Sequence, residues 1–514
     1  MSKLSNVSKA SIILVIFFGL DKIFALIRQV LIARTFGLST ALDAFNVANN
    51  IPDMLFALIS GGSLAMALIP VLSGLISTDG KPAAWKLFSK IANLAFIVTA
   101  VVAVIVAFLS GPIVRSEFGV APGFGPEQQH LVINLMRFNL IATIIFSISG
   151  LIMAGLQANQ HFLLPAMAPL LYNIGQIFGA TILSPEKGYV LGGITLPAYG
   201  MGVYGLVVGV IIGAVMHLAI QIPGLIRYQF KWTPKIDLFS PEVIRVLKIL
   251  LPRLATMFFI QLIFIARDNL ASRLEEGAVS SLTYGWMIMQ VPESLIGTVI
   301  GTALLPTLSE HAAKKEWDLF REAINRAGRV LIALTIPASV IIAIGLRPVI
   351  SLAFGFGSEG TDLLLLVSWG YLAGLTGQCL LEIAVRSFYA RQNAITPLIT
   401  AAINAAFYIL LGSTLFRILG APGISLADSI AFTTQAVILL ILINRMAESK
   451  LEFRNTIFRS ILAAIAGGSV GLFIQWIGSQ NGISNFVIVP LIFIVAIIAV
   501  LPLIWREVKT LVKL

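Results

Sequence analysis

The chain has 514 residues, of which 58% are hydrophobic and only 11% are charged. With a mean hydropathy of +0.95 it cannot be a soluble domain, and it reads as a multi-pass membrane protein. The formal net charge is +11, but the cations gather in alternate connections between apolar segments, which indicates a cytoplasmic membrane surface rather than nucleic acid. The single cysteine, Cys379, excludes disulfides within the chain, and the four scattered histidines offer no metal-ligand spacing.

The first apolar segment, residues 10–32, carries three charges although it is long enough to cross a bilayer. Lys22 falls roughly 18 Å along it, where a charge costs about 2.5–3.5 kcal/mol on insertion scales. Asp21 and Arg28 are two helical turns apart and share one face, whereas Lys22 points about 100° away. A polar cavity lined by this segment is the favoured interpretation. The alternative is that Arg28 extends to the nearer surface and Asp21 neutralises Lys22 locally.

The second segment, residues 44–72, follows Asp43 and introduces a pattern that returns later. Its Ile51-Pro52-Asp53 recurs as Val291-Pro292-Glu293, and similar pairs keep offsets of 232 to 240 residues. Six spans in each copy give parallel repeats related by an axis along the membrane normal. Asp53 and Glu293 are therefore expected at equivalent helix breaks facing the interface between the lobes. Each is either a cation or proton site or a group that satisfies freed backbone.

Fourteen spans are predicted in all, and they imply an orientation. Their approximate ranges are 10–32, 44–72, 88–110, 131–155, 163–183, 202–226, 246–266, 282–308, 328–354, 363–388, 396–416, 424–444, 457–478 and 484–503. With the N-terminus inside, 24 of the 35 Lys and Arg lie in inner connections and only 7 in outer ones. Both termini are therefore expected in the cytoplasm. No small-residue cleavage site follows the first segment, which is expected to remain as a helix.

The predicted fold is an all-α integral membrane protein with two six-helix lobes, 1–228 and 229–447, followed by two C-terminal helices in 448–514. Such paired lobes are typical of alternating access. Residues Gly205, Gly209 and Gly213 form a small-residue stripe that favours close helix packing. Residues 227–248 and 310–329 are predicted to form amphipathic helices on the inner surface.

Catalytic motifs do not emerge. The sequence has no phosphate-cradling Gly-Lys-Ser/Thr loop and no Ser/His/Asp constellation. The acidic residues at membrane depth are Asp21, Asp53, Glu293, Glu382 and Asp428. They would supply an acid and a base to a membrane-embedded glycosyl- or phosphotransferase, but the repeat disfavours that class.

Several short motifs, in order and spacing, carry a family resemblance. They are Phe36-Gly37, Asp43-Ala44-Phe45, Ala121-Pro122-Gly123-Phe124, Leu304 through Ser309, and Phe388-Tyr389-Ala390-Arg391 with Thr396-Pro397. Over spans 1–12 the chain resembles the MurJ/MviN lipid II flippases of the multidrug/oligosaccharidyl-lipid/polysaccharide exporter superfamily. The resemblance implies fourteen helices and a central cationic cavity that moves lipid II from the inner to the outer leaflet.

The family's four cavity arginines transfer to this chain only in part. The first two positions become Lys22 and Arg28, and the other two fall at Phe56 and Met287, neither of which is cationic. Arg253 and Arg267 are candidates to compensate. The candidate substrate-binding residues are Asp21, Lys22, Arg28, Asp43, Asp53, Arg253, Arg267 and Glu293.

The expected function is that of a lipid flippase, not an enzyme, in the bacterial cytoplasmic (inner) membrane. Its cargo would be an undecaprenyl-pyrophosphate-linked cell-wall precursor, lipid II, and its partners membrane lipids and other cell-wall synthesis proteins, with no nucleic acid. No cofactor is expected, and coupling to membrane potential or to a monovalent cation stays open. The alternatives are a polysaccharide-lipid flippase or a cation-coupled exporter of the same superfamily.

Overall fold

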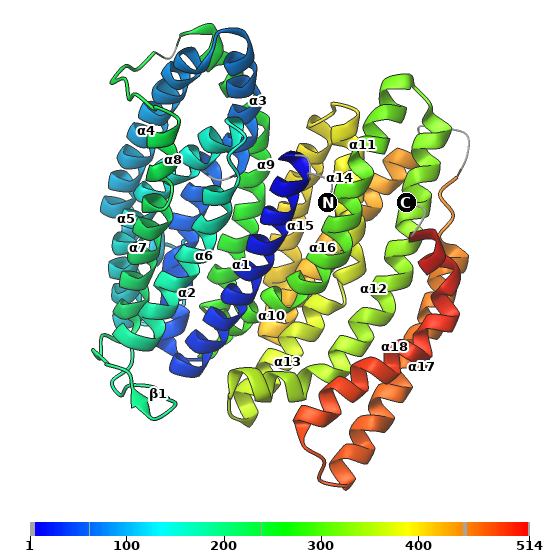
Figure 1. Cartoon of the computed structure of the whole chain (residues 1–514). Coiled ribbons are helices and arrows are strands. Elements are labelled where there is room, and N and C mark those ends of the chain that lie inside the picture. Colours follow the sequence, from blue (N-terminus) through cyan, green and yellow to red (C-terminus); the bar gives the residue numbers. More distant parts are fainter. Residues whose placement is uncertain (1–5, 61, 238, 446–449, 512–514) are drawn as a thin grey trace. The chain divides into compact units, whose positions relative to one another are not determined.

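The computed structural model describes residues 6–60, 62–237, 239–445 and 450–511 (Figure 1). The chain divides into two compact units, Met1–Asn269 and Leu270–Leu514. Apart from one short hairpin, the regular structure in the described ranges is helical, which confirms the predicted all-α class. The lobe boundaries predicted after residues 228 and 447 rest on the sequence repeat and stay a prediction.

The first unit holds nine α-helices, two π-helical turns and the hairpin, within the described residues. They are α1 (Asn6–Phe36), α2 (Thr40–Leu55), η1 (Phe56–Ser60), α3 (Gly62–Thr78), α4 (Lys81–Arg115), α5 (Pro126–Ala158), α6 (Leu163–Phe178), η2 (Gly179–Leu183), β1 (Val190–Leu191), β2 (Ile194–Thr195), α7 (Val203–Ala219), α8 (Ile222–Arg227) and α9 (Pro241–Ala271). The two strands are antiparallel, with Val190 opposite Thr195. Helix α9 continues two residues beyond the first unit.

The second unit contains the remaining helices and a third π-helical turn. They are α10 (Ala278–Pro292), η3 (Glu293–Thr298), α11 (Val299–Lys314), α12 (Trp317–Phe354), α13 (Ser358–Leu372), α14 (Leu375–Ala390), α15 (Ile395–Leu419), α16 (Ala421–Asn444), α17 (Arg454–Gln480) and α18 (Asn485–Leu511). Three of them, α12, α17 and α18, pack together around the buried apolar side chains of Ile341, Ala463 and Ala496 (Figure 1).

Eleven helices in the described ranges are long and apolar enough to cross a membrane, or twelve if α13 and α14, which meet at a bend of 41°, form one span. These twelve correspond to predicted spans 3 to 14, and the chain is a multi-pass membrane protein. The predicted count of fourteen is not confirmed. The first and second predicted spans are not among the apolar helices counted in the described ranges.

A π-helical turn lies close to each copy of the repeated proline–acid pair, beginning at Phe56 in the first unit and at Glu293 in the second. After Pro52 and Asp53 the helix continues into η1, and after Pro292 it enters η3 at Glu293. A proline within a helix has no N–H to donate and disturbs the preceding turn, so the ladder of hydrogen bonds is interrupted there. Both predicted helix breaks are therefore observed, in each unit by itself.

Helices α6 and α7 touch backbone to backbone, as the glycine stripe predicts. A Cβ placed on Gly209 would lie 2.8 Å from the Cα of Gly179, and one on Gly175 would lie 2.4 Å from the Cα of Gly213. No side chain fits at these distances, so glycine is required at the contact. The packing role predicted for the stripe is confirmed.

The predicted surface helix at 227–248 is wrong over most of its length. Residues 228–237, 239 and 240 are nonhelical, and contacts from this connection reach α4 before α9 begins at Pro241. Trp232 Nε1 donates to Asn93 Oδ1 at 2.7 Å, and Lys90 Nζ pairs with Asp237 at 2.6 Å. This hydrogen bond lowers the pKa of the Asp237 carboxyl. The polar side chains thus bind α4 instead of forming one face of a helix.

The second predicted surface helix, 310–329, is also wrong. Helix α11 continues through this segment to Lys314, and α12 begins at Trp317, so the segment is divided between two long helices. Lys315 has a φ of 60°, a left-handed conformation that ends α11.

Candidate functional site

A polar network joins α1 to α6 inside the first unit. Arg28 Nη1 donates to Asn173 Oδ1 at 2.8 Å, and Asn173 Nδ2 donates to Asp21 Oδ1, also at 2.8 Å. The Asn173 side chain is only 3% exposed. The shared face predicted for Asp21 and Arg28 is confirmed, because one amide from α6 reaches both.

This network fixes the direction of the Arg28 side chain. A hydrogen bond to a charged group contributes about 1.5–3 kcal/mol, more than a bond between neutral groups. Asn173 can serve both charges because an amide carries an acceptor oxygen and a donor nitrogen. Arg28 is thereby directed toward α6, which favours the interpretation that this face of α1 is a polar interior surface.

Asp53 lies near the same guanidinium. It is on α2, immediately before η1, with an exposed side chain, and Arg28 is close enough to act electrostatically on it and on Tyr172. Lys22 is exposed on α1, away from the Asn173 contacts, as its helical position predicts. We refer to Asp21, Lys22, Arg28, Asp53 and Asn173 as the α1 polar cluster. It contains two basic and two acidic side chains.

Phe56 occupies the third cation position of the family with an aromatic ring. Its ring centroid is 5.3 Å from that of Phe146, which in turn lies 5.0 Å from Tyr172 and 5.3 Å from His217. These edge and tilted contacts fill the space with apolar surface. Position 56 is therefore partly buried against aromatic side chains of the first unit.

Arg267 takes part in a polar network between α9 and α2. Its Nε is 2.9 Å from Asp268 Oδ1, and Asp268 Oδ2 accepts a hydrogen bond from Asn50 Nδ2 at 2.8 Å. Asp268 is 1% exposed, so the bonds tie α9 to α2. These bonds place Arg267 beside Asp268 and Asn50.

The two remaining predicted residues lie on α2 and α9. Asp43 is 2% exposed in the first turn of α2, where a carboxylate is stabilised by the helix N-terminus. Arg253 lies within α9, and its side chain falls outside the described residues.

Glu293 belongs to a cluster in the second unit. Thr298 Oγ1 donates to Glu293 Oε1 at 3.2 Å, and the Thr298 carbonyl accepts from Arg386 Nη1 at 2.9 Å. Arg386 also pairs with Glu382 at 2.9 Å. The backbone of η3 is thus bound to α14, and the buried Glu293 carboxyl lies within electrostatic range of Glu382. We name Glu293, Thr298, Glu382 and Arg386 the η3 cluster.

Part of this arrangement was not predicted from the sequence. Glu382 is among the acids expected at membrane depth, but its pairing with Arg386 was missed, although the two are four residues apart on one helix, a spacing that signals an ion pair. Asn173 and Asn50 carry no such signal, because the sequence does not tell which apolar helices are neighbours. In the described ranges no group of three or more His, Cys, Asp or Glu is arranged to hold a metal ion.

Solved structures define the class to which this fold belongs. "Lipid II flippase MurJ, inward closed conformation" superposes with a TM-score of 0.76 at 22% identity, covering 94% of this chain and 98% of that one. An inward-facing multidrug resistance MATE family transporter of the MOP superfamily gives a TM-score of 0.68 at 16% identity, covering 83% and 94%. The chain therefore shares the fold of these two structures.

The sequence comparison then assigns the family. A family model described as "Lipid II flippase MurJ" matches residues 32–498, and the chain belongs to the MurJ family. The lipid II flippase MurJ of Burkholderia cenocepacia is 28% identical over 432 residues, 82% of this chain and 81% of that protein. The probable lipid II flippase MurJ of Haemophilus influenzae is 25% identical over 475 residues, 88% of this chain and 89% of that protein. The predicted family is confirmed.

Proposed function

We propose that this chain translocates lipid II, an undecaprenyl-pyrophosphate-linked cell-wall precursor, from the inner to the outer leaflet of the bacterial cytoplasmic membrane. Membership of the MurJ family over residues 32–498 supports the cargo. The eleven or twelve apolar helices in the described ranges support a function within the membrane.

The single observation that supports the mode of binding is the fixed guanidinium of Arg28, held by Asn173 at 2.8 Å. A pyrophosphate is bound bidentately by an arginine and as a point charge by a lysine. We assign the first role to Arg28 and the second to Lys22. A guanidinium that is already oriented loses less side-chain freedom when the phosphate arrives.

Asp21 and Asp53 compete with the pyrophosphate for the same cations. In this proposal Asp53 is the coupling residue: when its carboxylate binds a proton or a monovalent cation, the α1 polar cluster gains one positive charge. The pyrophosphate then binds more tightly, and loss of that proton or cation promotes its release. No cofactor is needed, and membrane potential would act on the same charges.

Transport would proceed by alternating access, with rocking of the lobe of spans 1–6 against that of spans 7–12. The charge distribution supports both termini in the cytoplasm. Membrane lipids, and other proteins of cell-wall synthesis, are the partners proposed for a flippase at this place.

The test is rescue of a bacterium depleted of its own lipid II flippase. The wild-type chain should restore growth, Lys22→Arg should also restore it, and Arg28→Ala should not, at equal protein abundance. Purified chain in vesicles should then move lipid II across the bilayer. Failure of the wild-type chain to restore growth, together with no movement of lipid II in vesicles, would overturn the proposal. Rescue by the Lys22→Ala, Arg28→Ala double variant would overturn the pyrophosphate site.

A second candidate is a cation-coupled exporter of the same superfamily with another cargo. The observation that favours it is the balance of two acids against two bases in the α1 polar cluster, since an anionic cargo prefers an excess of cations. Vesicles in which the chain moves a cationic drug against a proton or monovalent-cation gradient, but does not move lipid II, would decide for this candidate.

A further inference from the structure

A basic pocket lies within the second unit where α12, α17 and α18 meet, and it is distinct from both clusters described above. Its volume is about 830 Å³, a size that suits a small polar ligand. The lining residues used below are Arg329, Lys450, Arg454, Arg459, Arg506 and Glu507. The lining contains five cationic and two acidic side chains, so it carries an excess of positive charge.

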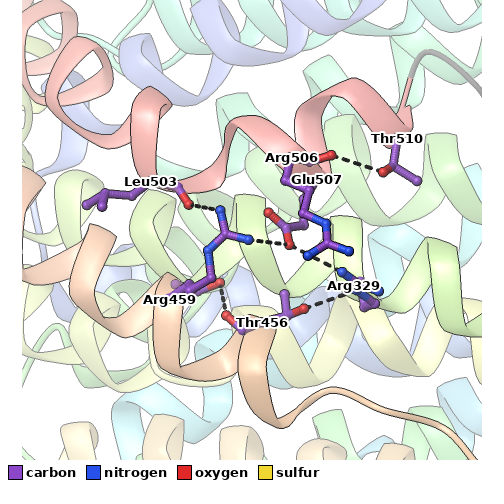
Figure 2. A network of polar contacts seen from close by, with 8 residues as sticks. Arg329, Thr456, Arg459, Leu503, Arg506, Glu507 and Thr510 are labelled. Atoms are coloured by element: carbon purple, nitrogen blue, oxygen red, sulfur yellow. Dashed lines mark hydrogen bonds and ion pairs between the residues drawn. The ribbon is translucent and has the colours of Figure 1, made fainter.

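Two of the arginines are fixed by one buried acid. Figure 2 shows Arg329 and Arg459 converging on Glu507, whose side chain is 3% exposed. Arg459 Nη1 is 3.2 Å from Glu507 Oε1, and Arg329 Nη2 is 3.5 Å from the same oxygen. Arg459 Nη2 also donates to the Leu503 carbonyl at 2.6 Å. The floor of the pocket is thus a rigid arrangement of two guanidinium groups.

The three other cations stand at the rim. Lys450, Arg454 and Arg506 have exposed side chains, and none of them has an ion pair within the described residues. Glu452 also lines the pocket, but the cations outnumber the acids five to two, so an anion placed between the rim cations would relieve the repulsion among them. The pocket therefore combines a fixed floor with an exposed cationic rim, an arrangement that fits a phosphate group.

The side chains near the pocket indicate whether a bound phosphate would belong to a lipid or to a soluble molecule. The pocket lies where α17 begins and α18 ends, and the neighbouring Phe458 and Trp505 are 64% and 49% exposed. Exposed aromatic side chains at helix ends are typical of the membrane–water interface, where headgroup phosphates lie. The charge distribution predicts that this end of both helices faces the cytoplasm. Basic pockets between membrane helices on that side bind anionic headgroups.

We propose that this pocket binds the phosphate headgroup of an anionic phospholipid. The two anchored arginines hold the phosphate oxygens, the rim cations close over it, and the acyl chains lie along the exposed apolar faces of α17 and α18. The lipid thereby connects α12 to the α17–α18 pair. This inference does not depend on the cargo, because binding is measured without transport.

The experiment is calorimetric titration of the purified full-length chain in detergent with dioctanoyl phosphatidylglycerol. Dioctanoyl phosphatidylcholine is the neutral-headgroup comparison, and glycerol 3-phosphate represents a soluble phosphate. We expect phosphatidylglycerol to bind most tightly. Arg454→Gln with Arg506→Gln should weaken its binding about fivefold for each cation removed. Both substitutions are at exposed positions and leave the Glu507 anchor intact.

The matched control is Lys86→Gln with Lys231→Gln, which removes two exposed cations from the first unit and should leave the affinity unchanged. Arg454→Lys with Arg506→Lys keeps the charge and should retain most of the binding. Equal weakening by the control pair would show diffuse surface attraction and overturn the pocket. Equal affinity for phosphatidylcholine would exclude anion recognition, and equal affinity for glycerol 3-phosphate would assign the pocket to a soluble phosphate instead of a lipid.

Discussion

The residue that most directly connects structure to the proposed transport is Asn173, which carries no charge. It orients Arg28 and separates it from Asp21 by accepting from one and donating to the other. Its loss would leave both charges to pair directly across one helix face, and the guanidinium would be less available to a phosphate.

Asn173→Ala should lower lipid II movement in vesicles about tenfold, because the orientation of Arg28 is worth about 1.5–3 kcal/mol. The matched control is Asn139→Ala, which removes a buried amide that bonds Asn49 at 2.7 Å in the same unit. Both variants should lose similar thermal stability, but only the first should lose transport. Equal transport by the two variants would show that Asn173 does not position Arg28 for transport.

The α1 polar cluster contains two acidic and two basic side chains, and Asp53→Asn removes one of the acidic ones. We expect tighter binding of pyrophosphate to the purified chain together with slower transport, because release no longer follows loss of a proton or cation. Binding is measured by titration with inorganic pyrophosphate, and transport by lipid II movement. Faster transport, or weaker binding, would remove Asp53 from the coupling role.

Phe56→Arg tests whether the third family position accepts a cation here. Because the ring packs on Phe146, a guanidinium at this partly buried position would lie against aromatic groups, and we expect a loss of about 1–3 kcal/mol in stability. Phe56→Leu keeps an apolar side chain and should cost far less. Thermal unfolding in detergent compares them, and a stable, active Phe56→Arg protein would place position 56 in a polar cavity.

Among the contacts between helices, the close backbone approach of α6 and α7 predicts how substitutions of glycine change the stability of the protein. Gly209→Ala should destabilise the protein by about 1–3 kcal/mol, because its Cβ would meet the Gly179 Cα at 2.8 Å. Gly111→Ala in α4 meets nothing within 4 Å and should stabilise by about 0.5–1 kcal/mol. Shifts of the unfolding temperature in opposite directions are expected, and shifts of the same sign would contradict the close contact.

The same helices and connections show which features of the fold could be predicted from the sequence and which could not. Period and composition predicted the twelve apolar helices, the stripe of Gly205, Gly209 and Gly213, and the shared face of Asp21 and Arg28, because each depends on local geometry. The partner Asn173 depends on which helices are neighbours, information that hydropathy does not contain. The amphipathic surface helix predicted for 227–248 is wrong, because Pro234 disfavours a helix and polar side chains of this connection bind α4.

At the scale of the whole molecule, the asymmetry of Lys and Arg predicts the orientation. In a variant without Cys379, cysteines at the exposed positions Ser116 and Ser358 should react with an impermeant thiol reagent added to intact cells, whereas one at Ser77 should not. Reaction of all three after lysis is the control for accessibility. Labelling of the Ser77 variant in intact cells would reverse the orientation.

The bond between Arg28 and Asn173 also bears on how the chain is made. The two residues are separated by 145 positions, and ribosomes add roughly 5–20 residues per second. A nascent α1 therefore waits about 7–30 seconds before α6 is synthesised. During that interval Asp21 and Arg28 have no amide to bind, and leaving the translocon for bare lipid is unfavourable. Helix α1 therefore reaches its final place only after α6 has been synthesised, and it requires a protected position beside the translocation machinery until then.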